Sequence, residues 1–314
     1  MNQLSVIIPF LNEGDEVCKT VENIRQTSGD EIKIILINDA STDGYDYRSV
    51  SKQFDAIYIE HEKRQGVASS RDEGIEISDS EYFLLLDGHM RFEERGWSEK
   101  FIQALESDSR AVFCGQTKQL SLNTGNATEA QRRPNSYGAY IDFEEKKWKA
   151  LWNYKDPDAT QSIIDIPIIY GASYACCKTF WKELGGLEGL IIYGMDEQFI
   201  SIKAWLSGGR CKLLKDVVVE HLYRKVFPYP MGYFHKVYNE IFLTELLLPE
   251  DLKDSFFDEI IKISPKKLAI RAIEDLIAKE DWIKERKEYY KLLFKFPFEF
   301  ILLQNKKIKD MQKK

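Results

Sequence analysis

Short apolar runs alternate with helical patterns along the first third of this 314-residue chain. The runs are rich in Ile, Leu, Val and aromatic residues, as buried strands are, and the segments between them space their apolar residues like one face of a helix. Strands that alternate with helices favour a mostly parallel sheet covered on both faces. The predicted strands are residues 4–9, 32–37, 56–59, 82–86 and 111–114.

Beyond residue 115 the pattern is less regular. Residues 116–165 are mostly polar with scattered aromatic residues, and we predict no regular structure there. Later segments read as short strands or helices, and from about residue 249 the pattern is helical and rich in Lys. The predicted strands are 173–177, 211–214 and 217–219, and the predicted helices are a short one that ends at Gly185 and one over 196–207.

Composition is that of a globular protein, with 44% hydrophobic and 30% charged residues. The sequence holds no apolar run of membrane-spanning length and opens without a basic leader, so we expect an unexported protein in the cytoplasm. Five cysteines without a CxxC pair fit a reducing compartment. A formal net charge of −7 argues against a long nucleic-acid footprint.

The segment Asp87-Gly88-His89, directly after the apolar run 82–86, carries most information about chemistry. A carboxylate and an imidazole at this spacing converge on one divalent ion if a third ligand comes from elsewhere. His221 is the candidate, because it also follows an apolar strand and the chain has four histidines in all. The alternative is that His89 and His221 are ordinary histidines, one in a turn and one at a strand end.

Several motifs now agree with one family. Ser5 to Glu13 (SVIIPFLNE), Ile37 to Ser41 (INDAS), Leu85 to His89 (LLDGH), Tyr193 to Trp205 and Val218 to Lys225 occur in the order seen in GT-A glycosyltransferases of family 2. The sequence most resembles the polypeptide N-acetylgalactosaminyltransferases, whose metal motif is likewise Asp-x-His. The resemblance implies a Rossmann-like α/β fold, mostly parallel, with a C-terminal helical extension. It further implies a nucleotide-sugar-binding half over 1–115, an acceptor-binding half over 116–248 and the extension over 249–314.

The resemblance also assigns residues. Asp87, His89 and His221 would hold Mn²⁺ or Mg²⁺ against the diphosphate of a UDP-sugar, with Arg224 near the phosphates. Asp39 and Arg71 would lie near the uracil and ribose, and Gly171 and Ala172 near the sugar. The alternative for Asp39, Arg71 and Arg224 is a structural role as a turn former or a surface charge. The remaining residues expected to line the donor pocket are Pro9, Asn12 and Glu13.

Asp196 and Glu197 are the expected catalytic pair. The retaining polypeptide transferases place Glu-Asn here and inverting family 2 enzymes place Glu-Asp, so this pair resembles the inverting pattern with the side-chain lengths exchanged. We therefore expect Glu197 to act as base and Asp196 to bind sugar hydroxyls. The alternatives are a retaining polypeptide-type transferase, or a purely structural pair at a helix N-terminus.

We expect a metal-dependent glycosyltransferase that moves a sugar from a UDP-sugar to a surface or lipid-linked glycan or a peptide. The rival hypothesis is a nucleotide-sugar-binding protein without transfer activity. Because the chain lacks the anchor, disulfides and lectin domain of the animal transferases, we expect a bacterial or viral origin. Residues 225–232 are expected to form a loop that closes over the donor. The extension is expected either to pack on the catalytic core or to dock on the inner membrane face or a partner subunit.

Overall fold

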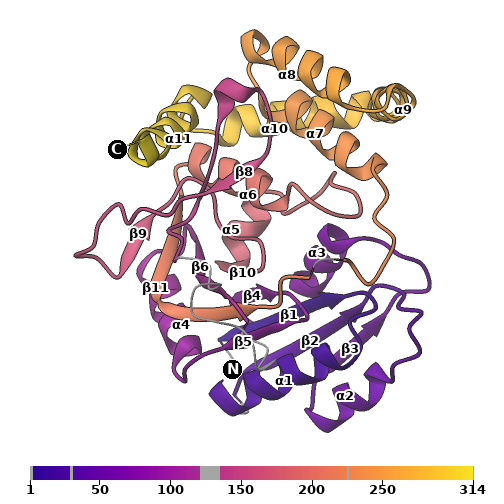
Figure 1. Cartoon of the computed structure of the whole chain (residues 1–314), viewed down its shortest axis with the longest axis vertical. Helices are drawn as coiled ribbons and strands as arrows, with labels where there is room; N and C mark the ends of the chain where they lie inside the picture. Colours follow the sequence, from indigo (N-terminus) through magenta and orange to yellow (C-terminus); the bar gives the residue numbers. More distant parts are fainter. Residues whose placement is uncertain (1–2, 29–30, 121–134, 225, 314) are drawn as a thin grey trace.

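The computed structural model describes residues 3–28, 31–120, 135–224 and 226–313. One mixed sheet runs through the centre of the chain in the strand order β3-β2-β1-β4-β10-β6-β11-β5, with β9 paired to β11 (Figure 1). Its first half alternates strands and helices as predicted: β1 (Leu4–Phe10), α1 (Asp15–Ser28), β2 (Lys33–Asn38), α2 (Tyr47–Gln53), β3 (Ile57–Glu60), α3 (Val67–Ile77) and β4 (Tyr82–Leu86).

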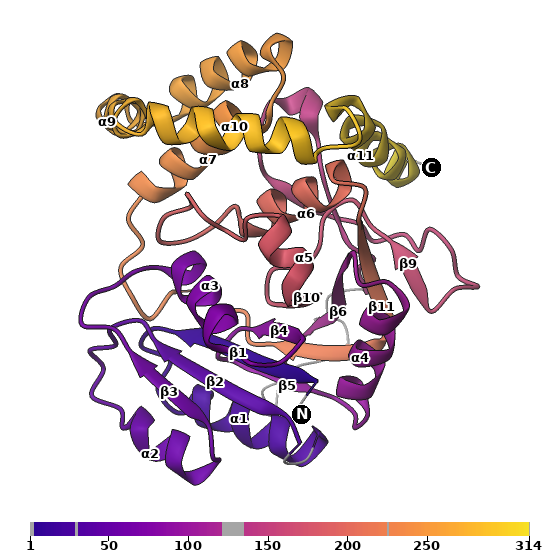
Figure 2. The same ribbon diagram turned by 180° about the vertical axis from the view of Figure 1, so that it is seen from behind.

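The first four strands are parallel and are buried most deeply at β1 and β4. Helices α1 and α2 lie on one face and α3 on the other, which both views show (Figures 1 and 2). Gly74 of α3 explains how close that helix comes, because a Cβ there would lie 2.4 Å from Ile7 Cγ2 on β1. The Rossmann-like part of the prediction is therefore confirmed.

The second half adds strands in both directions. Its elements are β5 (Met90–Phe92), α4 (Trp97–Ser107), β6 (Ala111–Gln119), β9 (Ile163–Asp165), β10 (Ser173–Cys177), α5 (Lys178–Glu183), α6 (Asp196–Leu206) and β11 (Arg210–His221). β10 runs antiparallel between β4 and β6, and β11 is parallel to β6 but antiparallel to β5. The two predicted strands 211–214 and 217–219 are one strand, with an irregularity between Leu214 and Val218.

Regular structure also occurs where we predicted none. The hairpin of β7 (Ala139–Ile141) and β8 (Ala150–Trp152), with the 3-10 turn Phe143–Glu145 between its strands, lies within residues 116–165. Trp148 anchors this segment, because it is fully buried and its indole nitrogen donates to Thr244 Oγ1 at 2.8 Å. The prediction failed here because three-residue strands held by one buried tryptophan leave no alternating pattern.

The C-terminal helices form a layer over one end of the sheet, at the top of both views (Figures 1 and 2). The layer begins earlier than the predicted position 249. Asn305 accepts from the backbone of Ile141 at 2.7 Å, and Phe256 packs on Trp148, so the layer shares the core of the catalytic half. Its helices are α7 (Phe234–Leu247), α8 (Glu250–Ile263), α9 (Lys266–Ile277), α10 (Glu280–Leu293) and α11 (Phe298–Lys313).

This packing agrees with the expectation that the extension joins the core, whereas docking on a membrane or partner stays a prediction. Among the described residues, no helix combines the length and the apolar character needed to cross a bilayer. All five cysteines are free, and four of them are buried, including the adjacent pair Cys176 and Cys177 on β10.

Candidate active site

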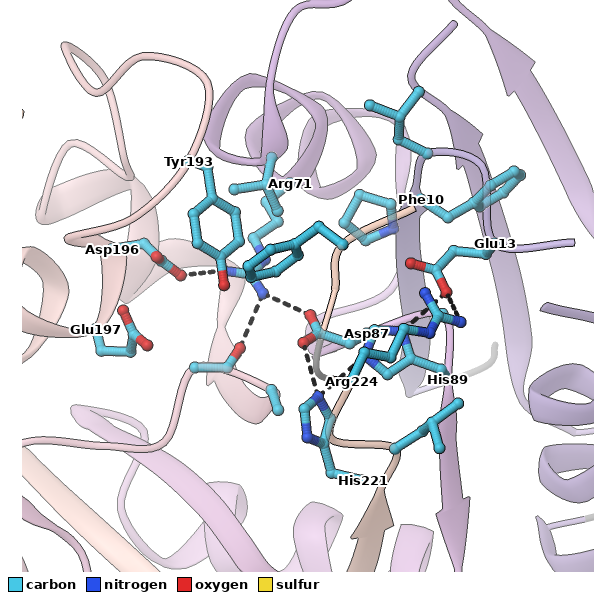
Figure 3. A pocket seen from close by; sticks show the side chains of 18 of the residues that line it. Phe10, Glu13, Arg71, Asp87, His89, Tyr193, Asp196, Glu197, His221 and Arg224 are labelled. Carbon is cyan, nitrogen blue, oxygen red and sulfur yellow. Dashed lines mark hydrogen bonds and ion pairs between the residues drawn. The ribbon is translucent and has the colours of Figure 1, made fainter. Parts of the chain in front are cut away.

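A cavity of about 370 Å³ opens beyond the carboxyl ends of β1, β2 and β4. It lies where parallel strands of an α/β sheet bind ligands. Figure 3 shows Asp196 and Glu197 on one side of Asp87, and Glu13 and Arg224 on the other. The predicted residues that line this cavity are Pro9, Glu13, Asp39, Arg71, Asp87, His89, Gly171, Ala172, Asp196, Glu197, His221 and Arg224.

Asp87, His89 and His221 converge as predicted. Antiparallel pairing of β11 with β5 places His221 opposite Met90, so the imidazole of His221 lies beside that of His89. The two Nε2 atoms are 3.0 Å apart, and His221 Nε2 is 3.7 Å from Asp87 Oδ2. One potential ligand atom from each residue lies within 4.8 Å of the others, a set that fits a divalent cation.

Glu13 supports this cluster from behind. Its Oε2 lies 3.0 Å from His89 Nδ1 and 2.6 Å from Arg224 Nη2. A carboxylate that accepts from Nδ1 keeps the proton on that nitrogen and leaves Nε2 free to bind a metal. Such a carboxylate is a usual hydrogen-bond partner of a metal-binding histidine. Glu13 was expected as a donor-pocket residue, and the structure adds this contact with a metal-ligand candidate.

The carboxyl of Asp87 is ready to bind a cation. Burial raises its pKa, but the hydrogen bond with His221 and the charge of Arg71 outweigh burial, so the pKa lies below its ordinary value. Asp87 is therefore ionised at neutral pH, and the donor set of one carboxylate and two imidazoles suits Mn²⁺.

Arg71 is buried beneath the cavity floor. Its Nη2 donates to Asp87 Oδ1 at 3.0 Å and to the Gly171 carbonyl at 2.8 Å, and its Nη1 pairs with Asp196. Its guanidinium also lies over the Tyr174 ring. Arg71 was expected near the base and ribose, and the structure joins it instead to the metal-side carboxylate and to the acidic pair.

Asp196 and Glu197 begin α6 but differ in environment. Asp196 is buried and pairs with Arg71. Both acidic residues lie in the first turn of the helix, so the structural alternative, electrostatic stabilisation of the helix N-terminus, stays open. Glu197 reaches the cavity against Gly171, where an added Cβ would lie 2.5 Å from Glu197 Oε1. Burial, followed by the charge of Asp196, raises the pKa of Glu197 well above its ordinary value.

Asp39, directly after β2, has both carboxylate oxygens engaged in hydrogen bonds. It accepts from the backbone of Gln65 at 2.6 Å and Gly66 at 2.8 Å, and it contacts His61 Nδ1 at 2.8 Å. Asn12 does not line the cavity, although we expected it to. Its side chain bridges two loops instead, accepting from Thr42 and donating to the Pro228 carbonyl.

The sequence reasoning missed several cavity residues. Tyr193, Arg64 and Trp152 line the site, and so do Tyr170 and Tyr223. Tyr193 stands just before the acidic pair, and its place in that motif was the available signal. Trp152 and Tyr170 gave no signal, because they lie in or next to the segment without a periodic pattern.

With this geometry in view, residues 5–167 match the family glycosyl transferase family 2, which is just over half of the chain. The chain belongs to glycosyl transferase family 2. The match contains Asp87 and His89, and it ends before the acidic pair and His221.

Relatives of this family 2 chain include polypeptide N-acetylgalactosaminyltransferase 5 of Caenorhabditis elegans, 25% identical over 82% of this chain and 43% of the relative. Polypeptide N-acetylgalactosaminyltransferase 3 of Mus musculus is 26% identical over 81% of this chain and 42% of the relative. The chain thus spans less than half the length of these curated relatives. Both are animal proteins, so the expectation of a bacterial or viral origin is not supported.

Solved structures share the fold. A crystal structure of GalNAc-T7 with UDP, GalNAc and Mn²⁺ matches with a TM-score of 0.70 and 21% identity, over 92% of this chain and 54% of that one. Staphylococcus aureus TarS in complex with UDP-GlcNAc matches with a TM-score of 0.54 and 12% identity, over 93% of this chain and 90% of that one. These matches confirm the predicted GT-A fold.

In this family 2 chain, the segment after His221 crosses the cavity. Phe227, Pro228 and Tyr229 line it, and the Pro230 carbonyl accepts from Arg64 Nη1 at 3.1 Å. The guanidinium of Arg64 also lies 5.0 Å from the centre of the Tyr229 ring. Lys225, the first residue of the predicted loop, lies outside the described residues. Closure of the remaining loop residues over the donor stays a prediction.

We expect Asp87→Ala and His221→Ala to lose most Mn²⁺ affinity, because each removes one ligand. Glu13→Ala should weaken Mn²⁺ binding by roughly 10–100-fold, because His89 loses the group that orients it. Titration calorimetry of the purified full chain measures all three variants. Glu16→Ala is the control, since Glu16 pairs with Arg91 and Lys19 and does not line the cavity. Unchanged affinity in Glu13→Ala would contradict the supporting role.

We expect UDP and Mn²⁺ together to protect Phe227 and Tyr229 from chymotrypsin, because a bound nucleotide gives the loop a surface to pack on. Limited proteolysis followed by mass spectrometry identifies the cut sites. Cleavage after Tyr154, which is 46% exposed and outside the cavity, serves as the internal control. Equal cutting after Phe227 and Tyr229 with and without ligands would argue for a static segment.

Proposed function

We propose that this chain transfers a sugar from a UDP-sugar to a hydroxyl acceptor in a metal-dependent reaction that inverts the anomeric centre. The main support is that one buried guanidinium, that of Arg71, joins the candidate metal cluster to the acidic pair. Arg71 connects Asp87, which belongs to the candidate metal cluster, with Asp196, which neighbours the candidate base. UDP in the GalNAc-T7 complex and UDP-GlcNAc in the TarS complex support the choice of donor.

A divalent ion held by Asp87, His89 and His221 would stabilise the negative charge that gathers on the diphosphate as the sugar leaves. Arg224 pairs with Glu13, which also contacts His89, so its guanidinium lies on the same side of the cavity as the metal cluster. Its charge assists the leaving group most in the transition state, when the diphosphate is most negative. The loop with Phe227 and Tyr229 would exclude water, which otherwise competes with the acceptor.

The acidic pair would act on the acceptor. Glu197 lies at the cavity surface against Gly171, where a carboxylate is free to take the proton of an attacking hydroxyl. A base whose pKa is raised holds the acceptor proton more firmly than an ordinary glutamate does. Asp196 is held by Arg71, so it acts mainly by keeping negative charge next to Glu197. A direct contact between Asp196 and sugar hydroxyls stays a prediction.

We expect at least one UDP-sugar to be hydrolysed slowly in the presence of Mn²⁺ and not after its removal by EDTA. The reason is that departure of the diphosphate needs the added positive charge. Release of UDP is measured over a panel of UDP-linked hexoses and N-acetylhexosamines, followed by an acceptor array. Binding of a UDP-sugar without hydrolysis or transfer to any acceptor would instead support a nucleotide-sugar-binding protein.

We expect Glu197→Gln to lower the transfer rate by about 10²–10⁴-fold, the usual contribution of a general base. Because the pKa of Glu197 is raised, the base form is lost as pH falls through that raised value, so kcat/KM should decline at higher pH than an ordinary glutamate would cause. Glu188→Gln, an exposed carboxylate outside the cavity, is the control.

The anomeric outcome is tested separately. Proton NMR of the first product formed from an α-linked UDP-sugar should show a β-linkage, because in-line attack on the anomeric carbon inverts it. An α-linked first product would contradict inversion and support a retaining, polypeptide-type reaction. Near wild-type turnover in Glu197→Gln would remove the base from the mechanism.

A further inference from the structure

An aromatic wall, formed by Trp152, Tyr170 and Tyr223, lines part of the cavity. Trp152, at the end of β8, stacks on Tyr170 with ring centres 4.9 Å apart and planes 23° apart. Its ring centre also lies 6.4 Å from that of Tyr223. Ala139 and Ala150, the small residues of the same hairpin, line the cavity beside Trp152.

This wall adjoins both chemical parts of the site. The ring of Tyr223 lies 4.3 Å from that of His221, a metal-ligand candidate. Tyr170 precedes Gly171, on which the carboxyl of Glu197 rests. A molecule on the wall would therefore lie between the metal cluster and the candidate base, which is where an acceptor hydroxyl must attack.

Two residues that line the cavity, Trp152 and Thr117, carry polar groups without a partner among the described residues. Trp152 is half-buried, and its indole N–H makes no hydrogen bond to the described residues and is not among their buried unpartnered atoms, so it is open to a ligand or to solvent. Thr117 on β6 is 5% exposed and lines the cavity, and its buried hydroxyl has no partner. Buried polar groups are normally paired, so the unpartnered Thr117 hydroxyl beside a cavity indicates a polar ligand.

We propose that Trp152, Tyr223 and Thr117 form an acceptor subsite for a pyranose ring, which makes the acceptor a glycan. This inference rests on the proposed transferase function and names its acceptor class. An indole face suits the C–H face of a sugar, while the N–H at its edge and the Thr117 hydroxyl bind ring hydroxyls. A peptide would instead bring a backbone N–H and C=O at every residue, and this wall of rings and alanines offers few partners for them.

The test uses the full chain with UDP and diamagnetic Mg²⁺, and a panel of methyl glycosides of glucose, galactose and their N-acetylamino forms. Saturation-transfer NMR detects which glycosides bind, and Ser/Thr peptides form the competing arm. Trp152→Ala should weaken glycoside binding by about tenfold or more, because it removes the stacking face. Trp152→Phe should restore part of the binding. Tyr154→Ala is the matched control, an aromatic residue two positions along that does not line the cavity.

Wild-type glycoside affinity in a Trp152→Ala protein with an unchanged thermal melting temperature would overturn the subsite. So would binding of Ser/Thr peptides but of no glycoside by the wild type. Calorimetry of UDP with the same wild-type preparation separates the two proposals. Absence of UDP binding would defeat the transferase proposal, whereas UDP binding with a negative glycoside result would defeat the subsite alone.

Discussion

The site depends on one buried ion-paired cluster, in which Arg71 joins Asp87 to Asp196. A buried guanidinium is costly unless its charge is matched, and here two carboxylates match the charge of Arg71. One of its terminal nitrogens also donates to the Gly171 carbonyl, whereas its buried Nε has no hydrogen-bond partner among the described residues. Arg71 reaches them because α3 packs closely on β1, which Gly74 permits. The packing of one helix on the parallel sheet therefore sets the spacing between the metal-side carboxylate and the acidic pair, which lie more than a hundred residues apart in sequence.

The antiparallel strands added to the parallel half complete this arrangement. β10 lies against β4 with Ser173 opposite Leu86, so Gly171 and Ala172 come beside Asp87, and the Asp87 N–H donates to the Ala172 carbonyl at 3.0 Å. β11 brings His221 back to β5. The pairing of β10 with β4 thus fixes the surroundings of Asp87, and the pairing of β11 with β5 brings His221 to the same metal cluster. A change of register in β11 by one residue would turn His221 to the opposite face of the sheet and break the cluster.

Local patterns were sufficient to predict the parts of this site that follow long apolar strands. Asp87 and His221 could be found because β4 and the end of β11 are unmistakably apolar, and the family motifs joined them. The environment of Arg71 could not be found in this way, because an arginine on a helix looks the same in sequence whether it is solvated or buried against two carboxylates. Nor could the hairpin with Trp152 be found, because its short strands are fixed by a buried tryptophan and by contacts with helices more than ninety residues later.

Charge balance gives a physical reason for metal dependence. Five carboxyl groups line the cavity, those of Glu13, Asp39, Asp87, Asp196 and Glu197, against three guanidinium groups. Even where the raised pKa of Glu197 keeps it protonated, the other four carboxylates outnumber the guanidinium groups. Of these three, Arg71 and Arg224 are already paired with carboxylates, and Arg64 contacts the Tyr229 ring and the Pro230 carbonyl. A diphosphate would enter this cavity against a surplus of negative charge, in surroundings where water screens charges poorly. Asp87 lies between Glu13 and the acidic pair (Figure 3), so a divalent cation at Asp87, His89 and His221 would reduce that repulsion. The same cation would reduce the repulsion between the cavity and the bound donor, and it would stabilise the negative charge that develops on the leaving group. Nucleotide binding and bond cleavage would therefore depend on a single ion.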